Sequence, residues 1–160
     1  RRGVIAVAAL LLVAMAYGTH ERNIVWHTEE SLWLDVTRKS PQNGRGLMTY
    51  GVIRMGKGDY TTADEYFQRA LPLVPEYSYL HVNIAILKGA LGRSAEAEEH
   101  FLTAQRLDPG NPVAYFFYAR WLTQVGRVPE AIGQARRATD LSPGYADAQD
   151  LLRLLNSRPR

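Results

Sequence analysis

The chain changes its pattern of apolar and polar residues near His20. From Gly3 to Gly18 the sequence holds only Gly, Ala, Val, Ile, Leu, Met and Tyr, whereas charged residues are spread evenly from Glu21 onward. A helix over the first run is apolar on all sides, so it needs lipid or other protein around its whole circumference. This pattern predicts a membrane or hydrophobic-core helix over residues 1–20.

Residues 3–19 would form a helix about 25 Å long, slightly shorter than the ~30 Å hydrocarbon core of a bilayer. Tyr17 at the headgroup level and the long side chains of Arg1 and Arg2 can make up the difference. We therefore expect membrane lipid to contact residues 3–19, or copies of the helix to meet in an assembly core. The expected contact residues are Val4, Ile5, Val7, Leu10, Leu11, Leu12, Val13, Met15 and Tyr17.

A second interpretation of this segment is a secretory signal peptide, since Arg1 and Arg2 precede the apolar centre and Ala14-Met15-Ala16 fits a small-x-small cleavage pattern. The chain does not begin with Met, which favours a retained helix. A buried helix of a soluble protein is a third interpretation, but three helical repeats alone could not cover it. Because basic residues favour the cytoplasmic side, Arg1 and Arg2 predict extracytoplasmic repeats, periplasmic or at the cell surface.

The remainder of the chain repeats with a fixed period. Pro41, Pro75, Pro109 and Pro143 follow one another at intervals of 34 residues. The same interval relates three further sets, which are Gly58, Gly92 and Gly126, then Ala63, Ala97 and Ala131, then Ala70, Ala104 and Ala138. Such self-similarity is typical of a solenoid built from one supersecondary unit.

This period and pattern resemble the tetratricopeptide-repeat (TPR) family, in which each unit is a pair of antiparallel helices. The resemblance implies an all-α solenoid of three full repeats, with a leading half repeat, a capping helix and the apolar helix in front. The expected segments are a linker and half repeat at 21–43, repeats at 44–77, 78–111 and 112–145, and a capping helix and tail at 146–160. The half repeat supplies its second helix, Thr28 to Lys39, and the closing helix runs from Ala146 to Asn156.

The shared residues have physical roles. Gly51 lies where the first helix approaches Ala63 of the second, and Gly58 with its equivalents ends each first helix at a positive φ. Phe67 and Phe101 fill the space between repeats. The third repeat has Ala135 at this position, so we expect either looser packing at the third interface or a neighbouring side chain such as Tyr145 to fill the space. At the N-terminal end of the solenoid we expect Trp26 and Trp33 to lie on one face of a helix and cover the open end of the first repeat. At the C-terminal end we expect four residues of the closing helix to pack inward, which are Leu151, Leu152, Leu154 and Leu155.

The TPR resemblance also implies that the first helices line a concave face that binds proteins. The positions that point into it are Arg45, Met48, Val52, Met55, Tyr79, Val82, Asn83, Ile86, Val113, Phe116, Phe117 and Arg120. TPR domains that clamp a terminal carboxylate use Lys, Arg and Asn in successive repeats, but only Asn83 occupies the usual Asn site here. The apolar character instead favours an amphipathic helix or another apolar segment as the ligand.

The residues offer little for catalysis or for metal binding. There is no cysteine, and no two histidines have the i, i+4 spacing of a helical metal site. We expect His20 and His27 to be solvated, His81 and His100 to lie at the edge of the core, and Glu96, Glu98 and Glu99 to favour a helix start. No phosphate-binding loop or nucleophile motif occurs, so we expect no catalytic residue, no metal, no cofactor and no enzyme activity.

The formal net charge of +3 comes largely from the chain ends, so the repeats lack the basic stripe that nucleic acid needs. We expect no nucleic-acid partner.

The junction between the apolar helix and the repeats reads Arg22-Asn23-x-x-Trp26-x-x-Glu29-x-x-Leu32-Trp33-x-Asp35-x4-Ser40-Pro41-x-Asn43. It resembles the transmembrane-and-TPR family of protein O-mannosyltransferase-like enzymes. The resemblance implies a last spanning helix followed by extracytoplasmic repeats, with the transferase part upstream.

Three functions fit the sequence. The chain is a membrane-anchored scaffold that binds a protein partner on the concave face, or a structural subunit that assembles with copies of itself into a filament or large homo-oligomer through the apolar helix. The third hypothesis is an extracytoplasmic accessory domain of a membrane glycosyltransferase.

Overall fold

The computed structural model describes residues 2–157, apart from the side chains of Arg22, Ile24 and Val25. Arg1 and residues 158–160, including the charged ends considered above, lie outside the described residues. The described residues form nine helices and no strand, which confirms the predicted all-α class. The helices are α1 (Arg2–Val25), α2 (Glu29–Lys39), α3 (Gly44–Gly56), α4 (Tyr60–Ala70), α5 (Ser78–Ala90), α6 (Ser94–Leu107), α7 (Pro112–Gln124), α8 (Val128–Leu141) and α9 (Ala146–Asn156).

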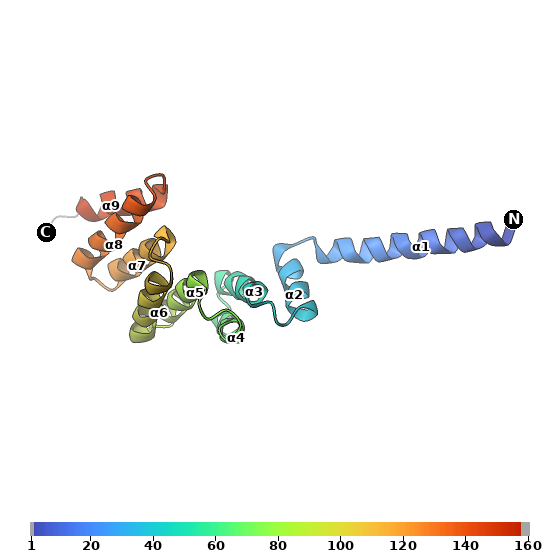
Figure 1. Cartoon of the computed structure of the whole chain (residues 1–160), viewed down its shortest axis with the longest axis horizontal. Helices are drawn as coiled ribbons and strands as arrows, with labels where there is room; N and C mark the ends of the chain where they lie inside the picture. Colours follow the sequence, from blue (N-terminus) through green and yellow to red (C-terminus); the bar gives the residue numbers. More distant parts are fainter. Residues whose placement is uncertain (1, 158–160) are drawn as a thin grey trace.

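Helices α3 and α4, α5 and α6, and α7 and α8 form three antiparallel hairpins stacked side by side in a curved array (Figure 1). Helix α2 packs against α3 at one end of the array, and α9 packs against α8 at the other. In Figure 1 the first helices α3, α5 and α7 lie along the inner side of the curve, and α4 and α6 along its outer side. Helix α1 projects away from the repeats.

The turn inside each hairpin follows the predicted chemistry. Gly58, Gly92 and Gly126 have φ values of 78°, 73° and 82°, and within residues 2–157 no residue other than glycine has a positive φ. A side chain at these three positions would be strained, because L-residues disfavour the left-handed region. The predicted helix-ending role of these glycines is confirmed.

Close helix packing inside the first hairpin depends on the absence of a side chain at Gly51. A Cβ atom placed there would lie 2.6 Å from Cε1 of Phe67, which is fully buried. The equivalent positions in the next hairpins are Ala85 and Ala119, both fully buried. Small residues at this position let the two helices of each hairpin approach closely.

An acid–cation pair joins each second helix to the following first helix. Arg54 Nη1 of α3 donates to Glu30 Oε1 of α2 at 2.6 Å, and Lys88 Nζ of α5 donates to Asp64 Oδ1 of α4 at 3.0 Å. Both partners of the second pair lie 34 residues after those of the first. We call these two pairs, with the Glu98 contacts described next, the ionic ladder.

The third member of the ionic ladder uses different partners. Glu98 of α6 keeps the 34-residue interval, but the cation position on α7 is occupied by Leu122. Glu98 Oε1 instead accepts from Arg127 Nη1 at 2.7 Å and from the Tyr118 hydroxyl at 2.6 Å. Burial and this carboxylate together raise the pKa of Tyr118, which therefore remains a neutral donor.

Several expectations at the two ends of the solenoid were wrong. Helix α1 extends to Val25, past the boundary at residue 20 of the predicted apolar segment. Trp26 falls in the turn after α1 instead of sharing a face of α2 with Trp33, and 62% of its surface is exposed. On α9, Leu155 is buried, but Leu154 is 54% exposed because it faces away from α8.

Tyr145 packs at the end of the third repeat, in a cluster separate from the one that holds Ala135. Its ring lies 4.9 Å from that of Phe116, centroid to centroid, beside the buried Ala138 and Ala148. Ala135 itself is fully buried in a cluster that includes Leu155 of α9. The contact between the third repeat and the closing helix is therefore well packed.

The ionic ladder makes a prediction about stability. Replacing Asp64 by Ala leaves the buried Lys88 ammonium with only Glu96, 3.8 Å away, so we expect the free energy of unfolding to fall by about 1–3 kcal/mol. Lys88→Met should cost less, because Asp64 is partly exposed and can be hydrated. Guanidinium unfolding of the full chain in mild detergent, followed by circular dichroism, measures both.

The exposed pair of Asp35 and Lys39 provides the control, since Asp35→Ala should cost less than about 1 kcal/mol. Equal costs for Asp64→Ala and Asp35→Ala would contradict a stabilising role for the ionic ladder.

Candidate protein-binding surface

The inner side of the curve carries most of the predicted partner-facing residues, and we call this surface the concave face. Arg45 and Arg120 are exposed, and Tyr79 is 40% exposed. Six others are partly exposed, which are Met48, Val52, Met55, Asn83, Ile86 and Val113. Met48, Val52 and Met55 pack against the buried cluster of the first hairpin with one side and leave the other accessible.

Two predicted members of the concave face are buried instead. Val82 is 2% exposed inside a cluster to which α5, α6, α7, α8 and α9 contribute, and Phe116 is 6% exposed beside Ala138 and Tyr145. Val82 packs with residues of α6 and α7, and Phe116 packs against Ala138 of α8 and Ala148 of α9. Val82 and Phe116 therefore support the concave face from beneath.

Aromatic rings hold both arginines of the concave face in place. The Arg45 guanidinium lies 4.7 Å from the centroid of the Tyr77 ring, and the Arg120 guanidinium lies 5.6 Å from that of Phe117. Such cation–π stacking restrains a long side chain and leaves the N–H edges free to donate. The asparagine expected at a carboxylate-clamp site, Asn83, donates its Nδ2 to the Tyr79 carbonyl of its own helix at 2.9 Å.

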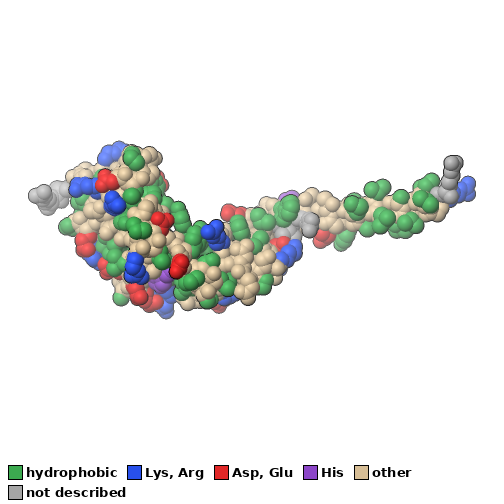
Figure 2. Space-filling view, viewed as in Figure 1, with side chains coloured by type: hydrophobic (Ala, Val, Ile, Leu, Met, Phe, Trp, Pro, Cys, Tyr) green, Lys and Arg blue, Asp and Glu red, His purple; other side chains and the backbone are tan. Residues whose placement is uncertain are grey.

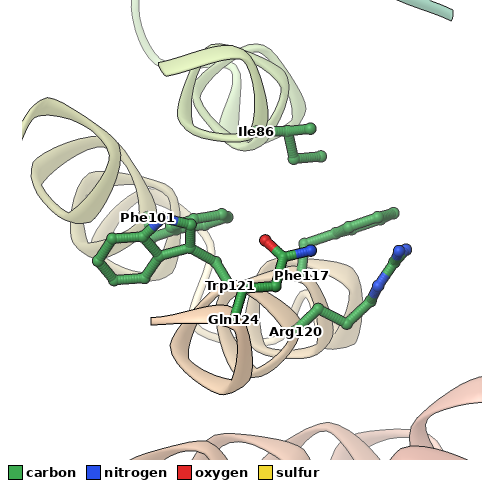
Figure 3. Close-up of a pocket in the computed structure, with 6 residues that line it drawn as sticks. All are labelled: Ile86, Phe101, Phe117, Arg120, Trp121 and Gln124. Atoms are coloured by element: carbon green, nitrogen blue, oxygen red, sulfur yellow. The ribbon is translucent and has the colours of Figure 1, made fainter. Parts of the chain in front are cut away.

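A cleft of about 80 Å³ opens on the concave face between α5 and α7 (Figure 3). Ile86 of α5 forms one wall, and Phe117, Arg120, Trp121 and Gln124 of α7 form the other, with Phe101 of α6 at the back. Figure 3 shows the Gln124 amide pointing from α7 toward Ile86, across the space between Trp121 and Phe117. We call this feature the α5–α7 cleft.

Trp121 seals the base of the α5–α7 cleft because α5 has no side chain at Gly89. A Cβ atom at Gly89 would lie 2.7 Å from Cδ1 of Trp121. Gln124 is not among the residues predicted from the sequence to line the concave face. Gln124 follows Arg120 at i+4 on the same helix face, which is the signal that could have identified it.

The apolar helix α1 is uncovered along its length. Residues Arg2–Glu21 have a mean hydropathy of 1.9, and none of this stretch is buried. Figure 2 shows its apolar side chains on the surface of the projecting arm. By length and composition this is the one helix within residues 2–157 that suits a membrane crossing.

Two histidines form a pair that sequence reasoning did not predict. The Nδ1 atoms of His81 and His100 lie 3.0 Å apart, and His81 Nε2 lies 2.9 Å from the Pro75 carbonyl oxygen. The carbonyl can only accept, so His81 donates from Nε2, and its Nδ1 accepts a hydrogen bond from Nδ1–H of His100. Burial, and then the neighbouring His81, lower the pKa of His100 below its usual 6.5.

Within residues 2–157 no three His, Asp or Glu side chains come close enough together to hold a metal ion. The paired histidines join α5 to α6 inside the second hairpin.

Comparison with protein families identifies the repeats. Residues 44–75 and residues 82–146 match models of the tetratricopeptide repeat, which together cover more than half of the chain. Among solved structures, the first TPR of Spaghetti (RPAP3) bound to an HSP90 peptide has a TM-score of 0.65 at 23% identity, covering 72% of this chain and 91% of that one. The second TPR domain of human RPAP3 in complex with an HSP70 peptide has a TM-score of 0.59 at 23% identity, covering 68% and 90%.

Among curated proteins, the chain is 30% identical over 115 residues to the protein O-mannosyl-transferase Tmtc3 of Drosophila melanogaster. It is 24% identical over 101 residues to human TMTC3. These alignments cover 72% and 63% of this chain but only 12% and 11% of the two relatives. The chain therefore spans a small part of the length of either relative, and the similarity is distant.

The histidine pair makes a prediction about pH. Because folding lowers the pKa of His100, the unfolded chain binds more protons below pH 6.5, so the free energy of unfolding should fall as pH falls from about 7.5 to about 5. His100→Gln should reduce this pH dependence, whereas the same change at the exposed His27 should leave it intact. Denaturant unfolding of the full chain at several pH values measures this dependence. If the free energy of unfolding changes equally with pH in the two variants, His100 is not the group responsible.

Proposed function

Because the chain is a tetratricopeptide-repeat protein, we propose that it is a non-catalytic scaffold, anchored to a membrane by α1, that binds a partner protein on its concave face. The observation that carries this proposal is the set of apolar, aromatic and arginine side chains exposed along α3, α5 and α7. An exposed apolar patch of this kind is typical of an interaction surface. The two TPR neighbours described above were solved with peptides, which supports a protein ligand.

The anchoring part of the proposal rests on α1. A fully exposed apolar helix is unfavourable in water, since burying apolar surface is worth about 25 cal/mol per Å². Lipid around residues 3–19 would remove that cost and hold the repeats close to the bilayer surface. We further propose that the repeats lie on the extracytoplasmic side, because Arg2 precedes the apolar stretch.

A second candidate function is a binding segment of a larger membrane glycosyltransferase. The similarity to the two O-mannosyl-transferases, which covers most of this chain, favours it. In that case the concave face would bind the acceptor protein or a partner of the enzyme, and the chemistry would belong to other parts of the protein. The repeats themselves would keep the same non-catalytic role.

A third candidate is self-assembly through α1. The uncovered apolar surface of α1 favours it, because copies of the helix could shelter one another while the repeats pack around them. Contacts of this head-to-tail kind can propagate into a filament.

Site-specific photocrosslinking of the full chain in native membranes tests the binding surface. A photoreactive phenylalanine analogue at Tyr79 should give a protein adduct. The same analogue at Leu102, on the outer helix α6 and similarly exposed, should not. Mass spectrometry of the adduct distinguishes a separate protein, a transferase and another copy of the chain, because the mass of each differs.

Adducts of equal yield at both positions, or no adduct at Tyr79, would contradict binding on the concave face.

A further inference from the structure

The three helices of the concave face contain no acidic residue. Their cations are Arg45, Arg54, Lys88 and Arg120, while every Asp and Glu lies on other helices or in turns. Arg54 and Lys88 are already paired in the ionic ladder. Arg45 and the acidic Glu76 line the same surface cleft.

Arg120, by contrast, lines a cleft whose residues include no acid. It is exposed, and within residues 2–157 it forms no ion pair. Its guanidinium is held over the rings of Phe116 and Phe117, at 5.7 and 5.6 Å from their centroids. A restrained guanidinium loses little side-chain entropy when it binds a planar carboxylate through two hydrogen bonds.

The α5–α7 cleft lies directly beside this cation and its walls are mainly apolar. Its volume of about 80 Å³ is roughly half of the ~150 Å³ cavity that holds a benzene ring, so it suits an aliphatic side chain better than an aromatic one. The Gln124 amide, which makes no hydrogen bond to another described residue, points across this space and can bond to a ligand backbone (Figure 3).

We propose that the α5–α7 cleft takes one Leu, Ile or Met side chain from an acidic segment of the partner protein, and that Arg120 binds a carboxylate next to that side chain. The proposal rests on the proposed function and specifies the class of ligand. Charge complementarity supports it, because an acidic segment meets no like charge on α3, α5 or α7. The α1 helix of a second copy fits poorly, since it offers no carboxylate from Gly3 to His20.

A peptide array tests the proposal. Twelve-residue peptides with a central Leu flanked by Glu, by Lys or by Gln are probed with the purified full chain in detergent. The Glu-flanked peptides should bind at least about 10-fold more strongly than the Lys-flanked ones, because a charge-assisted contact is worth more than ~1.4 kcal/mol. Replacing the central Leu by Ser should weaken their binding.

Two variants locate the binding site on the array. Arg120→Glu should reverse the charge preference, and Ile86→Phe should fill the cleft and weaken all Leu-centred peptides. Arg136→Glu, on the second helix α8 and also exposed, is the matched control and should change neither. Circular dichroism checks that each variant is folded.

Peptide binding without charge preference, or binding unaffected by Arg120→Glu and Ile86→Phe, would overturn the assignment of the α5–α7 cleft while leaving concave-face binding intact. If no peptide binds and the Tyr79 crosslink also fails, the proposed function itself is refuted. If no peptide binds but Tyr79 still crosslinks to a partner, only the acidic ligand is refuted.

Discussion

The structure depends on the packing of each second helix against the next first helix, repeated at an interval of 34 residues. Fully buried residues such as Phe67 and Phe101 fill that contact, and the acid–cation pairs of the ionic ladder lie beside them. A buried ammonium such as that of Lys88 is costly without its carboxylate, so the ladder penalises any shift in register. The register in turn decides which side chains face a neighbour and which face the inner side of the curve.

This division between packed and open positions gives the chain two separate surfaces. The repeats bury their apolar core among themselves, and only part of each first helix remains accessible on the concave face. Residues Arg2–Glu21 of α1 take no part in that core and are exposed. Repeats that are stable through nearest-neighbour contacts can bind a partner while α1 meets a different environment, such as lipid.

Much of the fold could be predicted from the sequence, because proline, glycine and alanine recur in fixed register and each has a backbone or steric reason. The concave face was harder to predict. Val82 and Phe116 match exposed positions by repeat alignment, yet contacts with neighbouring helices bury them. The ionic ladder was not evident from the sequence, because the residue types at its positions differ between repeats. The acid is Glu, Asp or Glu, the cation is Arg or Lys in the first two pairs, and in the third pair Leu122 occupies the cation position while Arg127 supplies the charge. The pair of His81 and His100 joins two helices and has no local sequence signal.

The central claim is that α1 and the repeats are separate working parts, one for lipid and one for protein. Negative-stain electron microscopy of the purified full chain, with detergent and after complete delipidation, tests it most directly. We predict small, uniform particles in detergent. When the detergent is removed, the protein should form irregular aggregates. Regular filaments or rings that survive delipidation would contradict the claim, because they would show that α1 is the core of an assembly.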